Sequence, residues 1–458
     1  MRNEALPGVP GEGSPKIDRK PGQPHGAVAR VAIVPHPEAP TRPPEADAGA
    51  RSPALTVVDL FCGAGGLSIG LGRAGFEVAR AYDHFGAAVE TYRRNVGDHV
   101  ERAEIHESMD LPPSTVVAGG PPCQGFSSAG SRRTGDKRNT LVSVYAALIV
   151  RYRPSAFIFE NVEGFLTAEG GERVMDLLRP LVAAGYRIHL RKVNAANYGV
   201  PQHRKRVLGI GGLGWSPTFL EPTHRAIGAP GAHRTGRHLP PTPTTLDALA
   251  GLGPPSSGPP GVPTGHFAPP LDDDDMARVS ALLEGQTMRD LPEEFWHESY
   301  RRRAFRRVMD GTPSERRGGA PCGIRRLVGD HPSKAITSCT RTECVHPREN
   351  RYLTLREAAR LQCFPDDFEF VGKQADQALL IGNAVPPTLS EAVGRSLIQD
   401  LREARTGTLP GALLSFVPTV AEAMSPALAH TMSLVHEAFS SEQNRPLNND
   451  RQGRLAWG

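Results

Sequence analysis

The sequence predicts an α/β protein in which a mostly parallel, doubly wound sheet is covered by helices and a smaller second domain is added. Short apolar strand-like segments alternate with helical segments between about residues 55 and 213, and regular elements resume after about residue 324. Such alternation is typical of parallel sheets covered on both faces. A glycine-rich segment also links the first strand to the first helix, where open sheets of this kind bind ligands.

The elements follow one another in a regular order. Strands are expected at residues 55–60, 76–83, 114–119, 155–160, 186–193 and 205–211. Helices are expected at residues 68–76, 85–95, 138–152, 171–185 and 390–404. The alternation stops over about 215–325, which holds a Pro/Gly-rich stretch, an acidic run at 272–275 and an arginine-dense segment.

Both ends of the chain differ from this core. Residues 1–53 contain eleven prolines and almost no aromatic residues, so we expect a disordered Pro/Gly-rich leader. Residues 406–458 show little pattern, so we expect a loosely ordered tail. No signal segment and no apolar run of membrane length is visible, which predicts a cytoplasmic protein without a membrane partner.

Composition narrows the class of protein further. The net charge of +4 over 458 residues suits a nucleic-acid partner without demanding one. The six cysteines form no disulfide framework and no paired CxxC set. The spacing of Cys322, Cys339, Cys344 and Cys363 fits no standard zinc pattern, so we expect no metal site and reduced thiols.

The segment DLFCGAGG predicts a ligand site at the end of the first strand. Gly63 and Gly65 would let backbone N–H groups approach a ligand, although Ser68 stands where a dinucleotide fingerprint would have its third glycine. A tight strand-to-helix turn is the alternative. Asp83 ends the next strand, where a carboxylate accepts hydrogen bonds from ribose hydroxyls, so the pair favours an adenosine ligand. Glu104 and Ile105 would contact the adenine, unless Glu104 is a solvated surface acid.

The segment GGPPCQGFS predicts a nucleophile. Cys123 follows two prolines in a polar, glycine-flanked loop after the third strand, which argues against the alternative of a small buried residue. A nucleophilic thiol needs nearby positive charge, which Arg204 and Arg206 would supply. Glu160 ends an apolar strand, where burial would raise its pKa toward use as a proton donor, a salt-bridged acid being the alternative.

Gln202, Arg204 and Arg206 alternate along the chain. In an extended segment their side chains point to the same side. Two guanidinium groups on one face suit an oxygen that gains negative charge, or a phosphate. A solvated basic strand edge is the alternative.

Taken in order, these segments resemble the DNA (cytosine-5) methyltransferase family of prokaryotic type. The matching segments are DLFCGAGGLSIGLGRAGF, GGPPCQGFS, ENV, NYGVPQHRKRV, RYLTLREAARLQCFPDDFEF and IGNAVPPTLSEAVG. The resemblance covers about 55–213 and 323–402. This chain departs from the family pattern at two positions: the family's usual aspartate is replaced near Thr115, and Ala103 stands where a glycine is usual.

The resemblance implies a Rossmann-like methyltransferase fold. Residues 54–214 would form the catalytic and cofactor-binding domain, 215–325 a target-recognition domain, and 326–405 the return to the catalytic domain. The implied cofactor is S-adenosyl-L-methionine. Its expected contacts are Phe61, Gly63, Gly65, Leu67, Asp83, Glu104, Ile105, Pro122 and Asn383.

The resemblance also implies the chemistry. Cys123 would add to carbon 6 of cytosine, Glu160 would hold N3 and the exocyclic amine, and Arg206 with Arg204 would bind O2. The base would be flipped out of the duplex. Nine arginines between residues 297 and 326 make phosphate contacts plausible, with a solvated helix face as the alternative. The expected DNA-binding residues are Gln124, Ser127, Gln202, Arg301, Arg302, Arg303, Arg306 and Arg307.

Three functions follow from this pattern. The first is a monomeric methyltransferase of double-stranded DNA, acting alone or with a cognate restriction endonuclease that cuts the same site. The second is a transfer-RNA cytosine-5 methyltransferase of the same family, whose recognition region is usually more compact than the stretch seen here. The third is a catalytically silent DNA-binding protein, which would have no need of Cys123, Glu160 and Arg206 together.

Overall fold

The computed structural model describes residues 54–122, 141–226, 238–298, 300–301, 323–403, 413–418 and 424–439. The chain divides into two units, residues 1–52 and 53–458, and every described residue belongs to the second unit. The expected leader at 1–53 therefore lies outside the described residues, apart from its boundary. So do Cys123, Gln124, Ser127 and four of the predicted DNA-binding arginines, Arg302, Arg303, Arg306 and Arg307.

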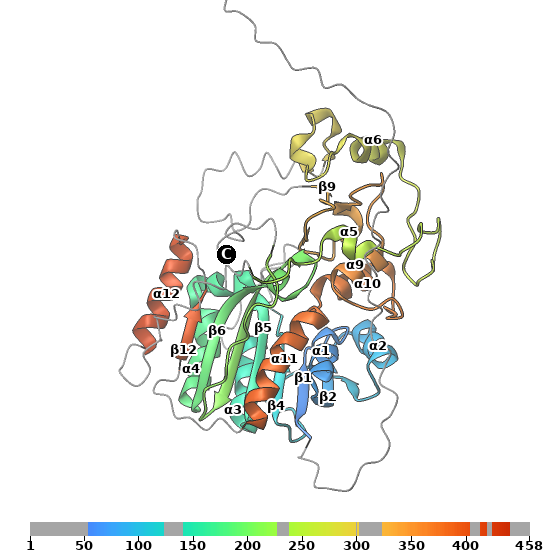
Figure 1. The fold of residues 1–458 in the computed structure, drawn as a ribbon. Coiled ribbons are helices and arrows are strands. Elements are labelled where there is room, and N and C mark those ends of the chain that lie inside the picture. The colour runs from blue at the N-terminus through green and yellow to red at the C-terminus, as the bar shows by residue number, and fades with distance from the viewer. Residues whose placement is uncertain are drawn as a thin grey trace, which may run out of the picture. The chain divides into compact units, whose positions relative to one another are not determined.

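An eight-stranded sheet forms the centre of the second unit, in the order β12-β6-β8-β5-β4-β1-β2-β3 (Figure 1). Its strands are β1 (Thr56–Leu60), β2 (Glu77–Asp83), β3 (Val100–Arg102), β4 (Val116–Gly119), β5 (Ala156–Val162), β6 (Tyr186–Asn194), β8 (Lys205–Leu213) and β12 (Leu413–Val417). β8 runs antiparallel to β5 and β6, and the other pairs are parallel. The predicted mostly parallel α/β class is confirmed.

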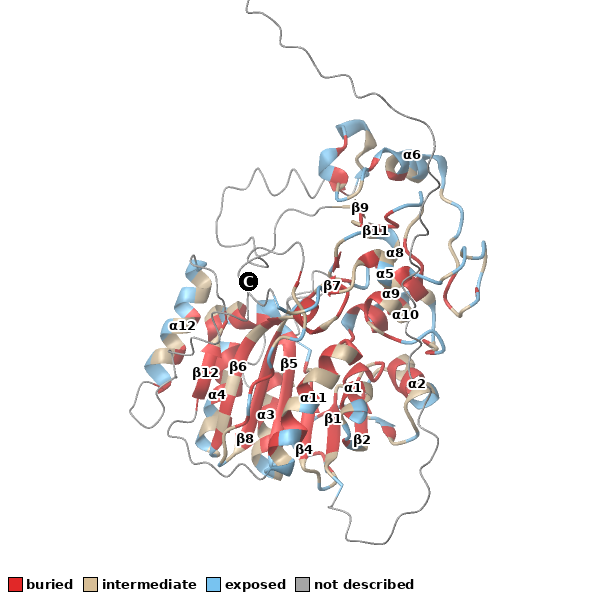
Figure 2. Ribbon diagram, in the orientation of Figure 1, coloured by how far each residue is buried: buried red, intermediate tan, exposed pale blue. Residues whose placement is uncertain are grey.

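Helices cover both faces of this sheet. They are α1 (Gly66–Ala74), α2 (Gly86–Asn95), α3 (Leu141–Tyr152), α4 (Glu172–Ala183), α11 (Pro387–Arg402) and α12 (Pro426–Phe439). Successive strand residues enter different cores: Phe157 packs in the cluster of α3 and α4, and Ile158 in that of α1 and α11. This alternation follows from the two-residue period of a strand, and it leaves the strands buried on both faces (Figure 2).

α1 and α11 approach closely because each presents glycine to the other. A Cβ atom added to Gly70 would meet the backbone of α11 at Pro387, and one added to Gly394 would meet Ala74 and Leu71 of α1. The first helix among the described residues is therefore packed against a helix more than 300 residues later in the chain.

The remaining described elements are short. They comprise β7 (Gln202–His203), α5 (Thr245–Leu249), α6 (Asp273–Ala281), β9 (Arg325–Arg326), β10 (Ser333–Lys334), α8 (Thr340–Glu343), β11 (Cys344–Val345), α9 (Leu355–Leu361) and α10 (Gln374–Asn383), with 3₁₀ turns η1 (Glu163–Gly171), η2 (Ala195–Tyr198), η3 (Met288–Asp290) and η4 (Glu293–Phe295). Arg326 joins several of them, because its buried guanidinium donates to the carbonyl oxygens of Val279, Leu282, His346 and Glu349. The domain boundaries expected at 215 and 325 stay a prediction.

Two segments of the expected loosely ordered tail are ordered elements. β12 extends the sheet beside β6, and α12 packs against η1 and α4. The sequence gives little sign of this, because the partners of both segments lie more than 200 residues earlier.

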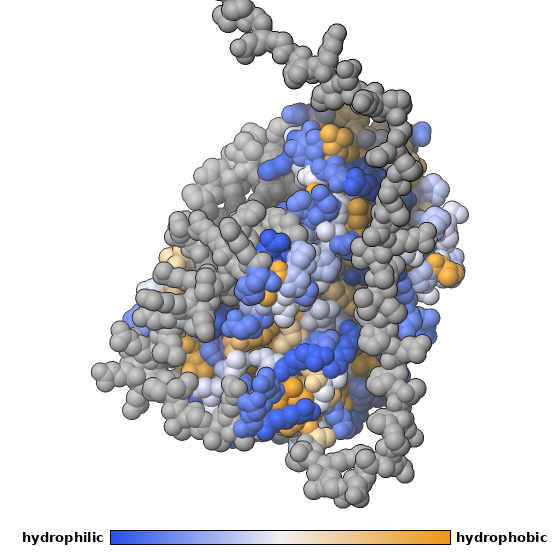
Figure 3. Space-filling view, viewed as in Figure 1, coloured by the Kyte–Doolittle hydropathy of each residue, from blue (hydrophilic) through white to orange (hydrophobic). Residues whose placement is uncertain are grey.

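Where described residues are visible on the face shown in Figure 3, apolar residues form separate patches among hydrophilic ones. Among the described residues, no helix is long and apolar enough to cross a membrane. Within the same residues, no group of three or more His, Cys, Asp or Glu side chains is placed to hold a metal ion.

Candidate active site

A cavity of about 530 Å³ opens where the strands β1, β2, β4 and β5 end. Its lining residues are Phe61, Cys62, Gly63, Ala64, Leu67, Asp83, His84, Phe85, Ala88, Gly120, Pro121, Pro122, Glu160, Asn161, Val162, Arg206, Leu379, Leu380, Asn383, Ala384 and Val385. Open α/β sheets bind ligands at this edge, and the volume is that of a small-molecule site.

The glycine segment shapes one wall of this cavity. Phe61, Gly63 and Gly65 all have positive φ, at 61°, 55° and 89°. Gly65 caps the amino end of α1, and a Cβ atom there would meet Tyr92 and Val96 of the neighbouring α2 segment. Glycine is therefore required by both backbone angle and space, and the turn brings the amino end of α1 to the cavity.

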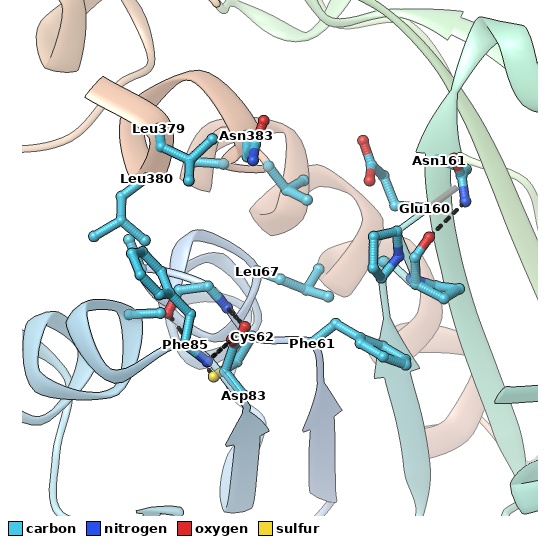
Figure 4. A pocket seen from close by; sticks show the side chains of 18 of the residues that line it. Phe61, Cys62, Leu67, Asp83, Phe85, Glu160, Asn161, Leu379, Leu380 and Asn383 are labelled. Atoms are coloured by element: carbon cyan, nitrogen blue, oxygen red, sulfur yellow. Dashed lines mark hydrogen bonds between the residues drawn. The ribbon is translucent and has the colours of Figure 1, made fainter. Parts of the chain in front are cut away.

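Asp83 lines the cavity on the same side as the glycine segment, and its carboxylate is held in place by two hydrogen bonds (Figure 4). One carboxylate oxygen accepts a hydrogen bond of 2.9 Å from the N–H of Gly63, and the other accepts one of 2.8 Å from the N–H of Phe85. Each oxygen retains acceptor capacity for a further donor. The carboxylate is thus oriented by the backbone and still able to bind hydroxyl groups of a ligand.

Three of the predicted cofactor residues do not line the cavity: Gly65, Glu104 and Ile105. Gly65 instead forms the turn before α1, where its positive φ is required. Glu104 is exposed, and Ile105 is buried in the core cluster of α3 and α4. Phe61, Gly63, Leu67, Asp83, Pro122 and Asn383 do line it.

Glu160 and Arg206 form a buried ion pair at the opposite wall. The Nε atom of Arg206 lies 2.9 Å from a carboxylate oxygen of Glu160, and the two side chains are only 13% and 10% exposed. The antiparallel register makes this possible by placing Arg206 opposite Val162, two residues beyond Glu160. Burial raises the pKa of Glu160, against the opposing effect of the nearby Arg206 and Arg204 charges.

Gly120 leaves room for this pair. A Cβ atom at position 120 would lie 3.1 Å from a carboxylate oxygen of Glu160. The carboxylate therefore packs directly against the backbone that leads to residue 123.

Asn161 holds the chain just before Cys123. Its side-chain amide donates a hydrogen bond of 2.9 Å to the carbonyl of Pro121, as Figure 4 shows. Its carbonyl oxygen accepts from the N–H of Val162. Asn161 had no predicted role, although its place beside Glu160 in the ENV segment was an available signal. Phe85, Leu379 and Leu380 were also missed, because nothing in their local sequence marks them as cavity walls.

Gln202 and Arg204 differ from their predicted roles. Gln202 is fully buried, and its side chain bonds to the carbonyl of Leu361, the amide of Gln362 and the N–H of Ile336. Such a side chain is not available to DNA. Arg204 is equally buried and donates to three backbone carbonyls, those of Ile336, Gly382 and Ala384. Its guanidinium therefore binds backbone of the segments that follow the variable region.

Arg301 is the one predicted DNA-binding arginine of the variable region that the described residues include. It donates to the carbonyl of Glu293. This contact supports the short η4 turn and leaves its proposed role in DNA binding untested.

The open α/β sheet, the glycine turn and the acid-bearing cavity at its strand ends define a Rossmann-like enzyme. The model of the C-5 cytosine-specific DNA methylase family matches residues 55–224 and 282–399, which is more than half of the chain. The chain therefore belongs to this family, and it is a DNA (cytosine-5-)-methyltransferase.

Individual relatives agree with this assignment. The chain is 32% identical to the type II methyltransferase M.AgeI of Thalassovita gelatinovora, over 75% of this chain and 99% of that protein. It is also 32% identical to the type II methyltransferase M1.HphI of Haemophilus parahaemolyticus, over 75% and 87%. A solved structure of an E. coli prophage protein, described as a DNA modification methyltransferase, shares the fold with a TM-score of 0.55 and 24% identity, covering 76% of this chain and all of that one.

Proposed function

We propose that this enzyme transfers a methyl group from S-adenosyl-L-methionine to carbon 5 of a flipped-out cytosine in a specific DNA sequence, through a covalent bond from Cys123 to carbon 6. The observation that carries the proposal is the buried Glu160–Arg206 pair in the cavity wall. Beside it, Asn161 holds the Pro121 carbonyl two residues before Cys123.

The residues that line the cavity support S-adenosyl-L-methionine as its ligand. Phe61, Leu67, Phe85, Leu379 and Leu380 offer apolar walls for an adenine ring and a methionine chain. The Asp83 carboxylate, oriented by two backbone N–H groups, suits the ribose hydroxyls. Asn383 and the amino end of α1 would hold the polar end of the ligand. When bound, the cofactor supplies an electrophilic methyl group on its sulfonium.

Glu160 and Arg206 suit activation of the base. A buried acid with a raised pKa holds its proton at neutral pH more readily than an exposed one, so Glu160 would donate to N3 and accept from the exocyclic amine. The guanidinium of Arg206 lies beside it, where it would stabilise negative charge on O2. Addition of the Cys123 thiolate to carbon 6 then makes carbon 5 nucleophilic. After methylation, loss of the carbon 5 proton expels the thiolate.

Recognition of the DNA sequence is assigned to about residues 215–325. The family match is interrupted between residues 224 and 282, as expected of a segment that differs with the target. We propose that Gln124, Ser127 and the arginines from Arg301 to Arg307 contact the DNA. The relatives are type II methyltransferases, which supports a cognate restriction endonuclease as a functional partner.

Double-stranded DNA containing 5-fluorocytosine tests the covalent step. Addition and methyl transfer proceed on this base, but fluorine cannot leave as a cation, so the enzyme should stay bonded to DNA after denaturation when S-adenosylmethionine is present. Cys123→Ser should give no such complex and almost no methylation, because an alcohol is a far weaker nucleophile than a thiolate. Cys339→Ser, which changes an exposed thiol, is the matched control and should trap normally.

Methylation by Cys123→Ser at a near wild-type rate would contradict the mechanism. Trapping on RNA but not on double-stranded DNA would favour the transfer-RNA alternative. Tight DNA binding by the wild type without any methylation would favour the silent DNA-binding protein.

A further inference from the structure

The C-terminal segment 413–439 lies beyond the family match, which ends at residue 399. Even so, β12 is the edge strand of the central sheet and α12 lies beside it and α4, drawn in red in Figure 1. The family model does not extend over these two elements, although both pack on the central sheet or the helices that cover it.

β12 is fixed to the sheet by a buried polar contact as well as by strand pairing. Ser415 is 1% exposed and pairs with His189 of β6. Its hydroxyl lies 2.6 Å from Nδ1 of His189 and accepts a 2.7 Å hydrogen bond from Arg191. The other ring nitrogen of His189 lies 2.9 Å from the carbonyl of Pro217. This network anchors the segment from which α12 follows.

α12 packs directly on η1, the turn that begins where β5 ends. Thr431 is fully buried, and its hydroxyl donates a 2.8 Å hydrogen bond to the carbonyl of Leu166 in η1. A Cβ atom at Gly171 would lie 2.6 Å from the same hydroxyl, so glycine allows this close approach. Val435 and Phe439, four and eight residues further along α12, enter the same core cluster as Leu166.

η1 needs such support because its backbone is irregular. Glu169, Gly170 and Gly171 all have positive φ, at 46°, 70° and 99°. For Glu169 this region is unfavourable, and such conformations persist where surrounding contacts hold them. Arg173 forms an ion pair with the Glu169 carboxylate, and α12 packs against the same turn.

The turn is connected to the catalytic pair through two aromatic rings. Phe165 of η1 packs on Phe159, with ring centroids 5.1 Å apart. Phe159 directly precedes Glu160 in β5. A shift of η1 would therefore displace the backbone of Glu160 in β5 and change its alignment with Arg206 in β8.

We propose that β12 and α12 form a positioning element for methyl transfer, in which Thr431 holds η1 and thereby the alignment of Glu160 with Arg206. This inference rests on the proposed function of that pair. Because Thr431 is remote from the Asp83 wall of the cavity, its effect should fall on the chemical step rather than on cofactor binding.

The test uses full-length enzyme and compares Thr431→Val with Thr431→Ser. Thr431→Val keeps the shape but removes the donor to Leu166, and it should lower kcat about tenfold, less than the roughly hundredfold loss of a 1 Å misplacement. KM for S-adenosylmethionine and for DNA should stay within about twofold of wild type, since binding is not the step affected. Thr431→Ser keeps the hydroxyl and should restore kcat. The rate of trapping on 5-fluorocytosine DNA should follow kcat.

Two control variants separate positioning from stability. Thr56→Val removes a hydroxyl that accepts the N–H of Thr115 at the amino end of β1, far along the sheet from the cavity. It should lower the melting temperature with kcat unchanged for folded enzyme. Ser433→Ala changes an exposed residue of α12 and should alter neither.

The outcomes are distinct. A folded Thr431→Val enzyme with wild-type kcat would overturn the inference and leave the proposed function intact. If Thr431→Val does not fold, Val435→Ala takes its place, and an unchanged kcat per folded molecule would overturn the inference in the same way. Absence of methylation by the wild type would instead refute the proposed function.

Discussion

Asp59 is a buried acid of β1, two residues before Phe61 of the cavity lining, and its environment favours its neutral form. It is fully buried in β1, and one of its oxygens accepts a 2.6 Å hydrogen bond from Ser68, which in turn accepts one from Tyr92. Its other oxygen has no hydrogen-bond partner among the described residues. Burial raises the pKa of Asp59 to about 7, and the nearby Asp83 charge adds to this effect.

Asp59 should make folding stability depend on pH. The pKa of Asp59 in the folded protein is raised above the ordinary value of 3.8. The contribution of the neutral side chain to folding stability is therefore fully present below pH 3.8, and it is lost as the pH rises through about 7. Asp59→Asn removes the titration. The difference in unfolding free energy between wild type and variant should therefore change by about 1 kcal/mol per pH unit over this range. Urea unfolding at several pH values measures it, and parallel profiles for the two proteins would contradict the assignment.

The sequence predicted some residues of the candidate site but not the partners of others, and the difference has a physical reason. Asp83 ends β2, and Glu160 lies two residues before the end of β5. The edge of a parallel sheet brings such ends together, so sequence order was enough to place both residues in one cavity. Arg206 was also placed in it. Arg204 lies between β7 and β8 rather than within a strand. The alternation could not indicate its partners, which are carbonyls of residues more than 130 positions later.

At the scale of elements, long periodic segments were predicted well and short ones were not. The helices α3 and α4 and the strands β5 and β6 lie close to their expected ranges, because their apolar residues repeat over many positions. β3 has three residues and was missed. β12 was missed because a five-residue apolar segment becomes a strand only where a sheet edge, here β6, is available.

Arg204 should hold the start of β8 to the carboxyl end of α10 and to the segment at Ile336. Arg204→Met leaves the carbonyls of Ile336, Gly382 and Ala384 without this buried donor, so we expect a loss of about 3 kcal/mol or more in unfolding free energy. Lys205→Met changes the exposed neighbouring side chain and should cost little. Chemical denaturation compares the two, and equal stabilities would show that Arg204 has no such role.

At the scale of the whole molecule, several hydrogen bonds reach the backbone of the variable region from residues outside it. Arg326 lies just beyond the expected boundary and donates to the carbonyls of Val279 and Leu282. A backbone carbonyl is present whatever the side chain. A segment of similar chain path could therefore replace the native one without losing these bonds.

Exchanging residues 215–325 for the matching segment of another family member should transfer the methylated sequence. The catalytic cavity draws its lining from residues outside that range, so the chimera should keep its chemistry. Sequencing of 5-methylcytosine in DNA from cells that express the chimera would identify the site. An active chimera that still marks the parental sequence would place specificity elsewhere in the chain.

The glycine-mediated packing of α1 on α11 sets a condition on how the chain is made. About 320 residues separate the two helices, and at 5–20 residues per second α11 leaves the ribosome roughly 15–60 s after α1. Until then the apolar face of α1, with Leu67 and Leu71, has no α11 to cover it. α11 must therefore be synthesised before α1 is fully packed and the wall of the cavity beside it is complete. A nascent chain stalled within the variable region would expose that apolar face to chaperones. Its cavity would also be incomplete, so the proposed cofactor could not bind there and stabilise the chain.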